Sequence, residues 1–159
     1  MKAIQLLACA LGAFACCAGA AERSTEADAL ALIKKAQEYI KANGMDKAIV
    51  EFNRLDSSFN AASDINKNGD LYLFMLDSKG YQAVHGKNPK IRGKVMIDMR
   101  DQDGVYLIRD MAALCTGSAG HGWVSYRWPN PVTKDLESKR GYVERIPGTD
   151  TCIGTGIYK

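Results

Sequence analysis

The stretch Gly120-His-Gly-Trp-Val-Ser-Tyr-Arg-Trp-Pro-Asn-Pro131, followed by Lys139-Arg-Gly-Tyr-Val-Glu-Arg145, decides how the chain folds. Residues 123–128 and 142–146 alternate as strands do, and the polar, Pro-containing segment between them is typical of a hairpin connection. Successive side chains of a strand point to opposite faces. One face of the first strand is therefore expected to carry Val124, Tyr126 and Trp128, and the other Trp123, Ser125 and Arg127.

Both faces of this strand carry an aromatic side chain, so both are expected to lie against other parts of the protein. One interpretation is a central strand with an ordinary core on each side. The other is a small pocket walled by tyrosine and tryptophan, with a cation that holds an anion. The alternation alone does not choose between them.

Residues 1–21 have the features of a signal peptide. Lys2 precedes an apolar run, and the small residues Ala18-Gly19-Ala20 suit signal peptidase. We expect cleavage near Ala20 or Ala21, which leaves a single domain over residues 22–159. The sequence Leu6-Leu7-Ala8-Cys9 has the form of a lipoprotein box, but too little apolar sequence precedes it for this interpretation to be favoured.

The charge of the chain points to no nucleic-acid partner. The net charge is +3, loss of Lys2 lowers it by one, and the basic residues are interspersed with acidic ones. The sequence has no second apolar run of membrane length, so a periplasmic or secreted protein with no membrane span after cleavage is expected.

Five cysteines are reduced to two by removal of the signal peptide, which contains Cys9, Cys16 and Cys17. Cys115 and Cys152 remain as an even pair in an oxidising compartment, and a disulfide between them is the simplest expectation.

Helical periodicity is clearest near the N-terminus. Thr25 and Asp28 form a capping-box pattern, apolar residues then recur at helical spacing, and Asn43-Gly44 ends the helix. Shorter helices are predicted over about 46–53 and over 105–114.

Strands are predicted over 71–76, 81–85, 95–99 and 151–158, in addition to the aromatic hairpin. In the last strand, Gly154 and Gly156 share one face, which leaves that face open for close packing or for a ligand. This order of elements predicts an α+β domain with a long helix packed on a largely antiparallel sheet.

Acidic loops suggest metal sites only superficially. Asp64-Ile-Asn-Lys-Asn-Gly-Asp70 matches the first half of an EF-hand loop, but Met75 stands where the bidentate glutamate belongs and a strand replaces the exiting helix. Asp98, Asp101 and Asp103 fit a helix-capping turn better than a metal site.

Other reactive residues do not form a catalytic pattern. His85 and His121 lack the spacing of zinc ligands, and Ser118 lacks the strand–turn–helix context of a nucleophile elbow. We therefore expect no metal, no cofactor and no enzyme activity.

The chain resembles the single Cache domain, a PAS-like extracytoplasmic sensor module, over nearly all of its mature length. The stretches that carry the resemblance are Lys35-Ala-Gln-Glu-Tyr-Ile, Asn43-Gly-Met-Asp-Lys-Ala, Gly69-Asp-Leu-Tyr-Leu-Phe-Met-Leu-Asp-Ser-Lys-Gly80, Val84-His85, Asn88-Pro-Lys-Ile-Arg-Gly93, Arg100-Asp-Gln-Asp-Gly104, Gly122-Trp-Val-Ser-Tyr-Arg-Trp-Pro-Asn-Pro131, Lys139-Arg-Gly-Tyr-Val143 and Gly154-Thr-Gly-Ile-Tyr158.

The resemblance implies a long N-terminal helix on a five- or six-stranded antiparallel sheet, with a small-molecule pocket on the other face of the sheet. Such domains serve chemotaxis and signal transduction and commonly bind acetate, propionate, lactate or pyruvate. Gly86 stands where the family usually has proline after the histidine. The sequence given ends at Lys159, directly after the last strand, so a stand-alone version of the sensor is expected.

We expect a binding protein for a short-chain carboxylate. Its tyrosines and histidine would donate hydrogen bonds, Lys139 would supply charge and Trp128 would cover the apolar end, with Arg127 as the alternative cation. The alternative function is a ligand-free interaction module, an accessory subunit of a membrane-bound receptor or kinase. The predicted ligand-binding residues are Tyr72, His85, Tyr126, Trp128, Lys139 and Tyr142.

Overall fold

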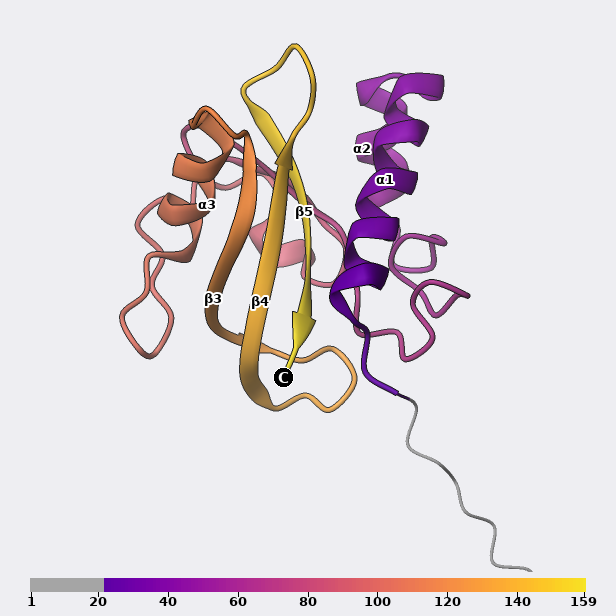
Figure 1. Ribbon diagram of the computed structural model, residues 1–159, viewed down its shortest axis with the longest axis vertical. Helices are drawn as coiled ribbons and strands as arrows, with labels where there is room; N and C mark the ends of the chain where they lie inside the picture. The colour runs from indigo at the N-terminus through magenta and orange to yellow at the C-terminus, as the bar shows by residue number, and fades with distance from the viewer. Residues whose placement is uncertain (1–21) are drawn as a thin grey trace, which may run out of the picture.

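A five-stranded antiparallel sheet, in the order β2-β1-β5-β4-β3, forms the centre of the computed structural model, which describes residues 22–159 (Figure 1). The predicted signal peptide, its cleavage site and its three cysteines lie outside the described residues. The elements are α1 (Glu26–Asn43), α2 (Met45–Phe52), β1 (Phe74–Asp77), β2 (Gln82–His85), a short 3₁₀ helix η1 (Pro89–Ile91), α3 (Leu107–Thr116), β3 (His121–Pro129), β4 (Leu136–Arg145) and β5 (Thr151–Tyr158).

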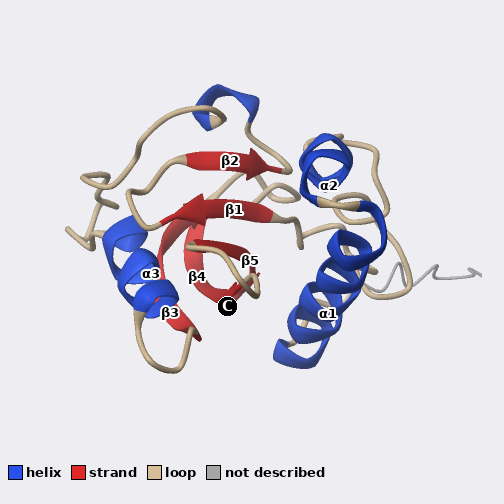
Figure 2. Cartoon of the chain, turned by 90° about the horizontal axis from the view of Figure 1, so that it is seen from above, coloured by secondary structure: helices blue, strands red, loops and turns tan. Residues whose placement is uncertain are grey.

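The helices cover opposite faces of the sheet. Seen from above, α1 and α2 lie on one side and α3 on the other (Figure 2). The predicted α+β architecture, with a long N-terminal helix on an antiparallel sheet, is therefore confirmed.

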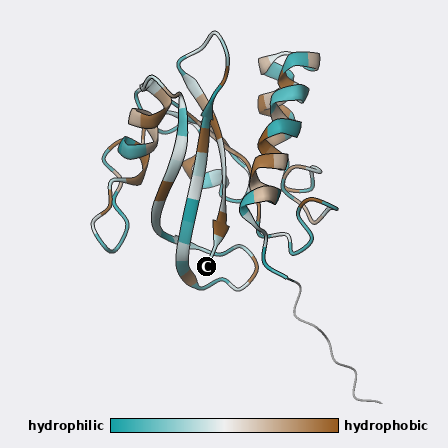
Figure 3. Ribbon diagram, in the orientation of Figure 1, coloured by the Kyte–Doolittle hydropathy of each residue, from teal (hydrophilic) through white to brown (hydrophobic). Residues whose placement is uncertain are grey.

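The first face is organised by α1, whose start was predicted from its capping box. The Thr25 backbone N–H donates to the Asp28 carboxylate at 2.8 Å, and the Thr25 hydroxyl accepts from the Asp28 N–H. Apolar and polar residues alternate along α1, so the helix turns one side to the sheet (Figure 3). The buried residues of α1 are Ala29, Leu32, Ile33 and Ala36, which join Ile153 and Ile157 of β5 in one core.

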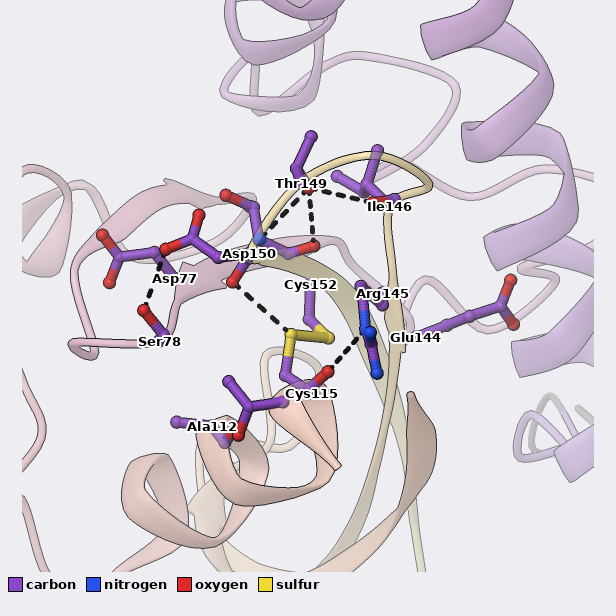
Figure 4. The surroundings of a disulfide bond; sticks show 12 residues. Asp77, Ser78, Ala112, Cys115, Glu144, Arg145, Ile146, Thr149, Asp150 and Cys152 are labelled. Carbon is purple, nitrogen blue, oxygen red and sulfur yellow. Dashed lines mark hydrogen bonds between the residues drawn. A yellow bond between two sulfur atoms is a disulfide. The ribbon is translucent and has the colours of Figure 1, made fainter. Parts of the chain in front are cut away.

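The second face holds a separate core under α3. Leu107, Ile108 and Met111 pack there with Phe74 of β1 and Val143 of β4. A disulfide joins α3 to β5, with the two Cα atoms 5.8 Å apart, so the predicted bond between Cys115 and Cys152 is confirmed (Figure 4).

Parts of two predicted strands are absent from the sheet. Residues 71–73 are buried but lie outside the sheet, because the Asn66 side chain accepts from the Leu71 N–H and the Asn60 side chain accepts from the Leu73 N–H. Residues 95–99 form no strand; Val95 makes an isolated bridge to Tyr81, and Met96 and Met99 pack against the core under α3.

Candidate functional site

The aromatic strand β3 divides its side chains between the two cores as its alternation predicts. Val124 and Tyr126 are buried with α3, and Trp128 packs against the same cluster. Trp123 packs on the α1 side. Lys139 of β4 lies opposite Tyr126 in the strand register and so brings a cation to the α3 face.

Tyr142 is not brought together with the other predicted ligand-binding residues. The strand β4 begins at Leu136, so Lys139 lies inside it, and a step of three residues along a strand reverses the face. The Tyr142 ring lies on the α1 side, 5.0 Å from the Trp123 ring. Its hydroxyl donates to Glu144, and burial together with that carboxylate raises the pKa of Tyr142 to about 12.

Lys139 is almost completely buried, with 1% of its surface exposed. Its Nζ lies 3.9 Å from the centre of the Tyr72 ring and donates to the Tyr158 hydroxyl at 3.3 Å. A Cβ at Gly156 would come within 2.6 Å of Lys139 Cε, so that glycine makes room for the lysine. Gly154 makes room for the Phe74 ring in the same way. The face of β5 that the two glycines leave open is therefore used for close packing.

The ammonium of Lys139 has no carboxylate partner within residues 22–159, because none of the ion pairs formed there includes it. Burial lowers the pKa of Lys139 well below its ordinary value of 10.5, and the negative charge of Asp70 acts in the opposite direction. Arg127, the alternative cation, instead pairs with Asp103 at 3.4 Å and is partly exposed.

His85 presents a hydrogen-bond donor to this site. Its Nδ1 accepts the backbone N–H groups of Lys87 and Asn88 at 3.3 and 2.9 Å, so the ring hydrogen must be on Nε2. Burial, and then the positive charges of Lys139 and Arg92, lower the pKa of His85 to about 3. The ring is therefore neutral at physiological pH.

Gly86, the departure from the family pattern, is explained by packing. A Cβ at this position would lie 2.0 Å from the Asn60 side-chain oxygen. The same Asn60 side chain donates to the Phe52 carbonyl at 2.8 Å, so the glycine beside His85 accommodates a buried amide.

A small cavity of about 20 Å³, enough for about one water molecule, lies on the α3 face. Four of the six predicted residues line it, whereas Lys139 does not line it but contacts Tyr72 and lies opposite Tyr126, which both do. The rest of the wall is mostly apolar and comes from residues outside the predicted ligand-binding set. The lining residues are Tyr72, Phe74, Gln82, His85, Ile91, Met96, Met99, Leu107, Ile108, Met111, Tyr126 and Trp128.

A second hollow, of about 330 Å³, shares Tyr72, His85 and Trp128 with the cavity. These three rings lie close together, with centroids 4.9 Å apart for Tyr72 and His85 and 6.1 Å apart for His85 and Trp128. Lys87 and Lys134 line the hollow and give it a positive charge, which favours the approach of an anion.

The acidic loops use their oxygen atoms for structure. Asn66 bonds to the backbone of Ala61 and Leu71, and Asp70 accepts from the hydroxyl and the N–H of Ser24. Asp101 accepts from the N–H groups of neighbouring residues, as a capping turn does. Within residues 22–159, no three His, Cys, Asp or Glu side chains gather closely enough to hold a metal ion.

Calcium is accordingly expected to have almost no effect on thermal stability. Asp70 is buried against Ser24, and Met75 supplies no oxygen ligand. Differential scanning fluorimetry with millimolar calcium, and with magnesium as the control, should show the same melting temperature. A rise of many degrees that Asp64→Ala abolishes would contradict this expectation.

None of the helices between residues 22 and 159 combines the length and the apolar character that a membrane crossing requires.

Three curated relatives each match a little more than half of the chain. They are the sensor histidine kinase MctS of Rhizobium johnstonii (32% identical over 60% of the chain and 20% of the relative), the methyl-accepting chemotaxis protein McpP of Pseudomonas putida (30%, 56% and 16%) and the methyl-accepting chemotaxis protein CtpM of Pseudomonas aeruginosa (33%, 60% and 17%). The chain thus spans at most about a fifth of the length of these relatives.

Solved structures of sensor domains share the fold. A methyl-accepting chemotaxis protein from Vibrio parahaemolyticus is 25% identical, with a TM-score of 0.66 over 84% of this chain and 87% of the other. A Cache chemosensory domain, described for the structural basis of carboxylic acid recognition, is 26% identical, with a TM-score of 0.58 over 80% and 84%.

The periplasmic sensor domain of a chemotaxis protein, 22% identical with a TM-score of 0.60 over 84% and 88%, shows the same fold. The family model of the Cache domain matches residues 23–159, which is the whole of the described chain except its first residue. The sheet, the helices on its two faces and the cavity under α3 agree with this match, and the chain belongs to the Cache domain family.

Proposed function

We propose that this Cache domain binds a short-chain carboxylate, of the acetate, propionate, lactate or pyruvate type, outside the cytoplasm. The observation that carries the proposal is the buried ammonium of Lys139, which has no carboxylate partner within residues 22–159. A buried charge is costly unless an opposite charge compensates it. The anion of a ligand would supply that charge.

The neighbours of Lys139 support an organic acid as the ligand. The Nε2–H of His85 and the hydroxyl group of Tyr126 offer donors for carboxylate oxygens, whereas the Tyr72 hydroxyl already donates to Tyr158. The rest of the cavity is mostly apolar and suits a short hydrocarbon chain. An acid is larger than the cavity, so side chains must move on binding, and the three methionines of the wall are the most adaptable of them.

The relatives agree with a role in sensing. Two of them are chemotaxis proteins and one is a sensor kinase, and one structural neighbour is described for carboxylic acid recognition. We infer binding rather than catalysis, and export directed by residues 1–21. The cavity and Lys139 favour a ligand-binding domain over the ligand-free accessory module.

A thermal-shift screen of the purified protein against two- to four-carbon acids tests the proposal. An acid present at 100 times its Kd stabilises the folded state by about 2.7 kcal/mol, which raises the Tm of a domain of this size by roughly 5–10 °C. The matched control is the amide of each acid, such as acetamide for acetate, which has similar shape and no charge. The proposal fails if no acid raises the Tm, or if the amides act as strongly as the acids.

A further inference from the structure

Gln82 places a carboxamide in the mostly apolar wall of the cavity. Only 1% of the residue is exposed, and its Nε2 donates no hydrogen bond to any group within residues 22–159. The backbone of Gln82 is already paired, because its N–H donates to Lys94 and its carbonyl accepts from Gly93. A buried amide without a partner is rare in folded proteins and calls for an explanation.

The position of Gln82 separates it from the other unpaired groups. Within residues 22–159, two further buried side-chain atoms lack a partner, Arg92 Nη2 and Thr155 Oγ1. Neither of these residues lines the cavity, whereas Gln82 does. The unpaired amide is therefore at the place where a bound molecule would meet it.

We propose that Gln82 is a specificity-determining residue, whose carboxamide binds a hydroxyl or carbonyl oxygen that the ligand carries in addition to its carboxylate. The proposal rests on the proposed function, because it takes the ligand to be a short acid. A carboxamide offers two N–H donors and one acceptor oxygen. A hydroxyl group can pair with either end of the amide, and a carbonyl oxygen with its N–H groups.

The strand geometry indicates which end of the acid meets Gln82. Gln82 and His85 both line the cavity, because a register shift at Ala83 brings these two residues of β2 to the same face. Their partners on β1, Leu76 and Phe74, are two residues apart, which corresponds to about 7 Å along a strand. With its carboxylate held near His85 and Lys139, the acid would turn its far end toward Gln82. Most of the other lining side chains, such as Met96 and Met99, are apolar, so the amide is the group that would distinguish an oxygen from a methylene at that end.

Calorimetry with matched pairs of acids tests the assignment on the whole purified protein. Propionate is compared with lactate and pyruvate, and butyrate with 3-hydroxybutyrate, 4-hydroxybutyrate and acetoacetate. At least one oxygen-bearing acid is expected to bind about tenfold more tightly than the alkanoate with the same number of carbons. The pair that shows the largest ratio identifies the position of the oxygen.

Gln82→Met keeps the length of the side chain and removes the amide. The tenfold ratio is expected to fall to about one, mainly because the oxygen-bearing acid binds more weakly. Gln102→Met, in an exposed loop, is the matched control and should preserve the ratio. Because both acids of a pair are measured on the same variant, a general loss of stability cancels from the ratio.

Three results would overturn the assignment. The first is a wild-type protein that binds the alkanoates at least as tightly as all of their oxygen-bearing partners, which leaves the proposed function standing. The second is an equal loss of affinity for both acids of a pair in Gln82→Met. If that variant does not fold, the same result in Gln82→Leu would count. The third is a protein that binds no acid of either kind, in which case the proposed function fails as well.

Discussion

Replacement of Lys139 by methionine is expected to lower the affinity for a short carboxylate by one to two decades. The ammonium is buried, and a charge-assisted hydrogen bond to a ligand anion is worth about 1.5–3 kcal/mol there, at about 1.4 kcal/mol per decade. Calorimetry with the acid that passes the thermal-shift screen measures the change. Lys34→Met, which removes the same charge from the exposed side of α1, should leave the Kd unchanged.

The fold should survive this replacement. Methionine fills most of the space of the lysine stem beside Gly156 and brings no charge into the core. An unchanged Kd in Lys139→Met would remove the residue from the site.

The pH dependence of the free energy of unfolding gives an independent test of the burial of Lys139. Burial lowers the pKa of Lys139 in the folded state, whereas in the unfolded chain it returns to about 10.5. Between these two values the unfolded chain binds more protons, so this residue makes the free energy of unfolding increase with pH across that window. Urea denaturation should show that increase in the wild type and a smaller one in Lys139→Met.

The fold could be predicted because its signals are local. The capping box of Thr25 and Asp28 defines the start of α1, and the alternation of residues 123–128 assigns each side chain to a face. Both patterns depend only on neighbours in the chain and on the periods of helix and strand. The disulfide required no geometry, since two cysteines in a chain that is predicted to be exported have one possible pairing.

The site was harder to predict because one strand boundary decides it. Residues 136–141 are mostly polar and do not look like a buried strand, yet β4 begins at Leu136. With the strand starting there, Lys139 becomes a core residue and Tyr142 turns to the opposite face. The error in one predicted strand boundary therefore led to a wrong environment for Lys139 and a wrong face for Tyr142.

The remaining cavity residues had no local pattern to reveal them. Gln82 lies on the short strand β2, and Met96 and Met99 lie in an irregular segment. They meet α3 and Tyr126 only through the tertiary fold. A polar residue among the buried positions of a strand was the one available signal, and it identifies Gln82 only when the burial of β2 is known.

Removal of the disulfide is expected to lower the free energy of unfolding by about 4 kcal/mol, the chain-entropy value for a closed loop of this length. The two cysteines are 37 residues apart, and the loop between them contains β3 and β4. For a domain of this size the Cys115→Ala, Cys152→Ala double variant should melt roughly 10 °C lower than the wild type. As the control, the wild type and the variant are both treated with dithiothreitol and compared.

Mass spectrometry of the non-reduced mature protein provides a direct check, and two free thiols would contradict the assignment. An unfolding free energy unchanged in the double variant would show that the bond adds no stability.

The surroundings of the disulfide indicate that its loss should leave ligand binding unchanged. Arg145 donates to the carbonyl groups of Cys115 and Gly117 at the end of α3, beside the bond (Figure 4). These hydrogen bonds and the packing of Leu107 and Met111 hold α3 on the sheet without the sulfur atoms. Because a disulfide acts largely by restricting the unfolded chain, the folded cavity should keep its shape. Well below the melting temperature, the double variant should therefore bind the acid within about twofold of the wild-type Kd, a difference of only about 0.4 kcal/mol.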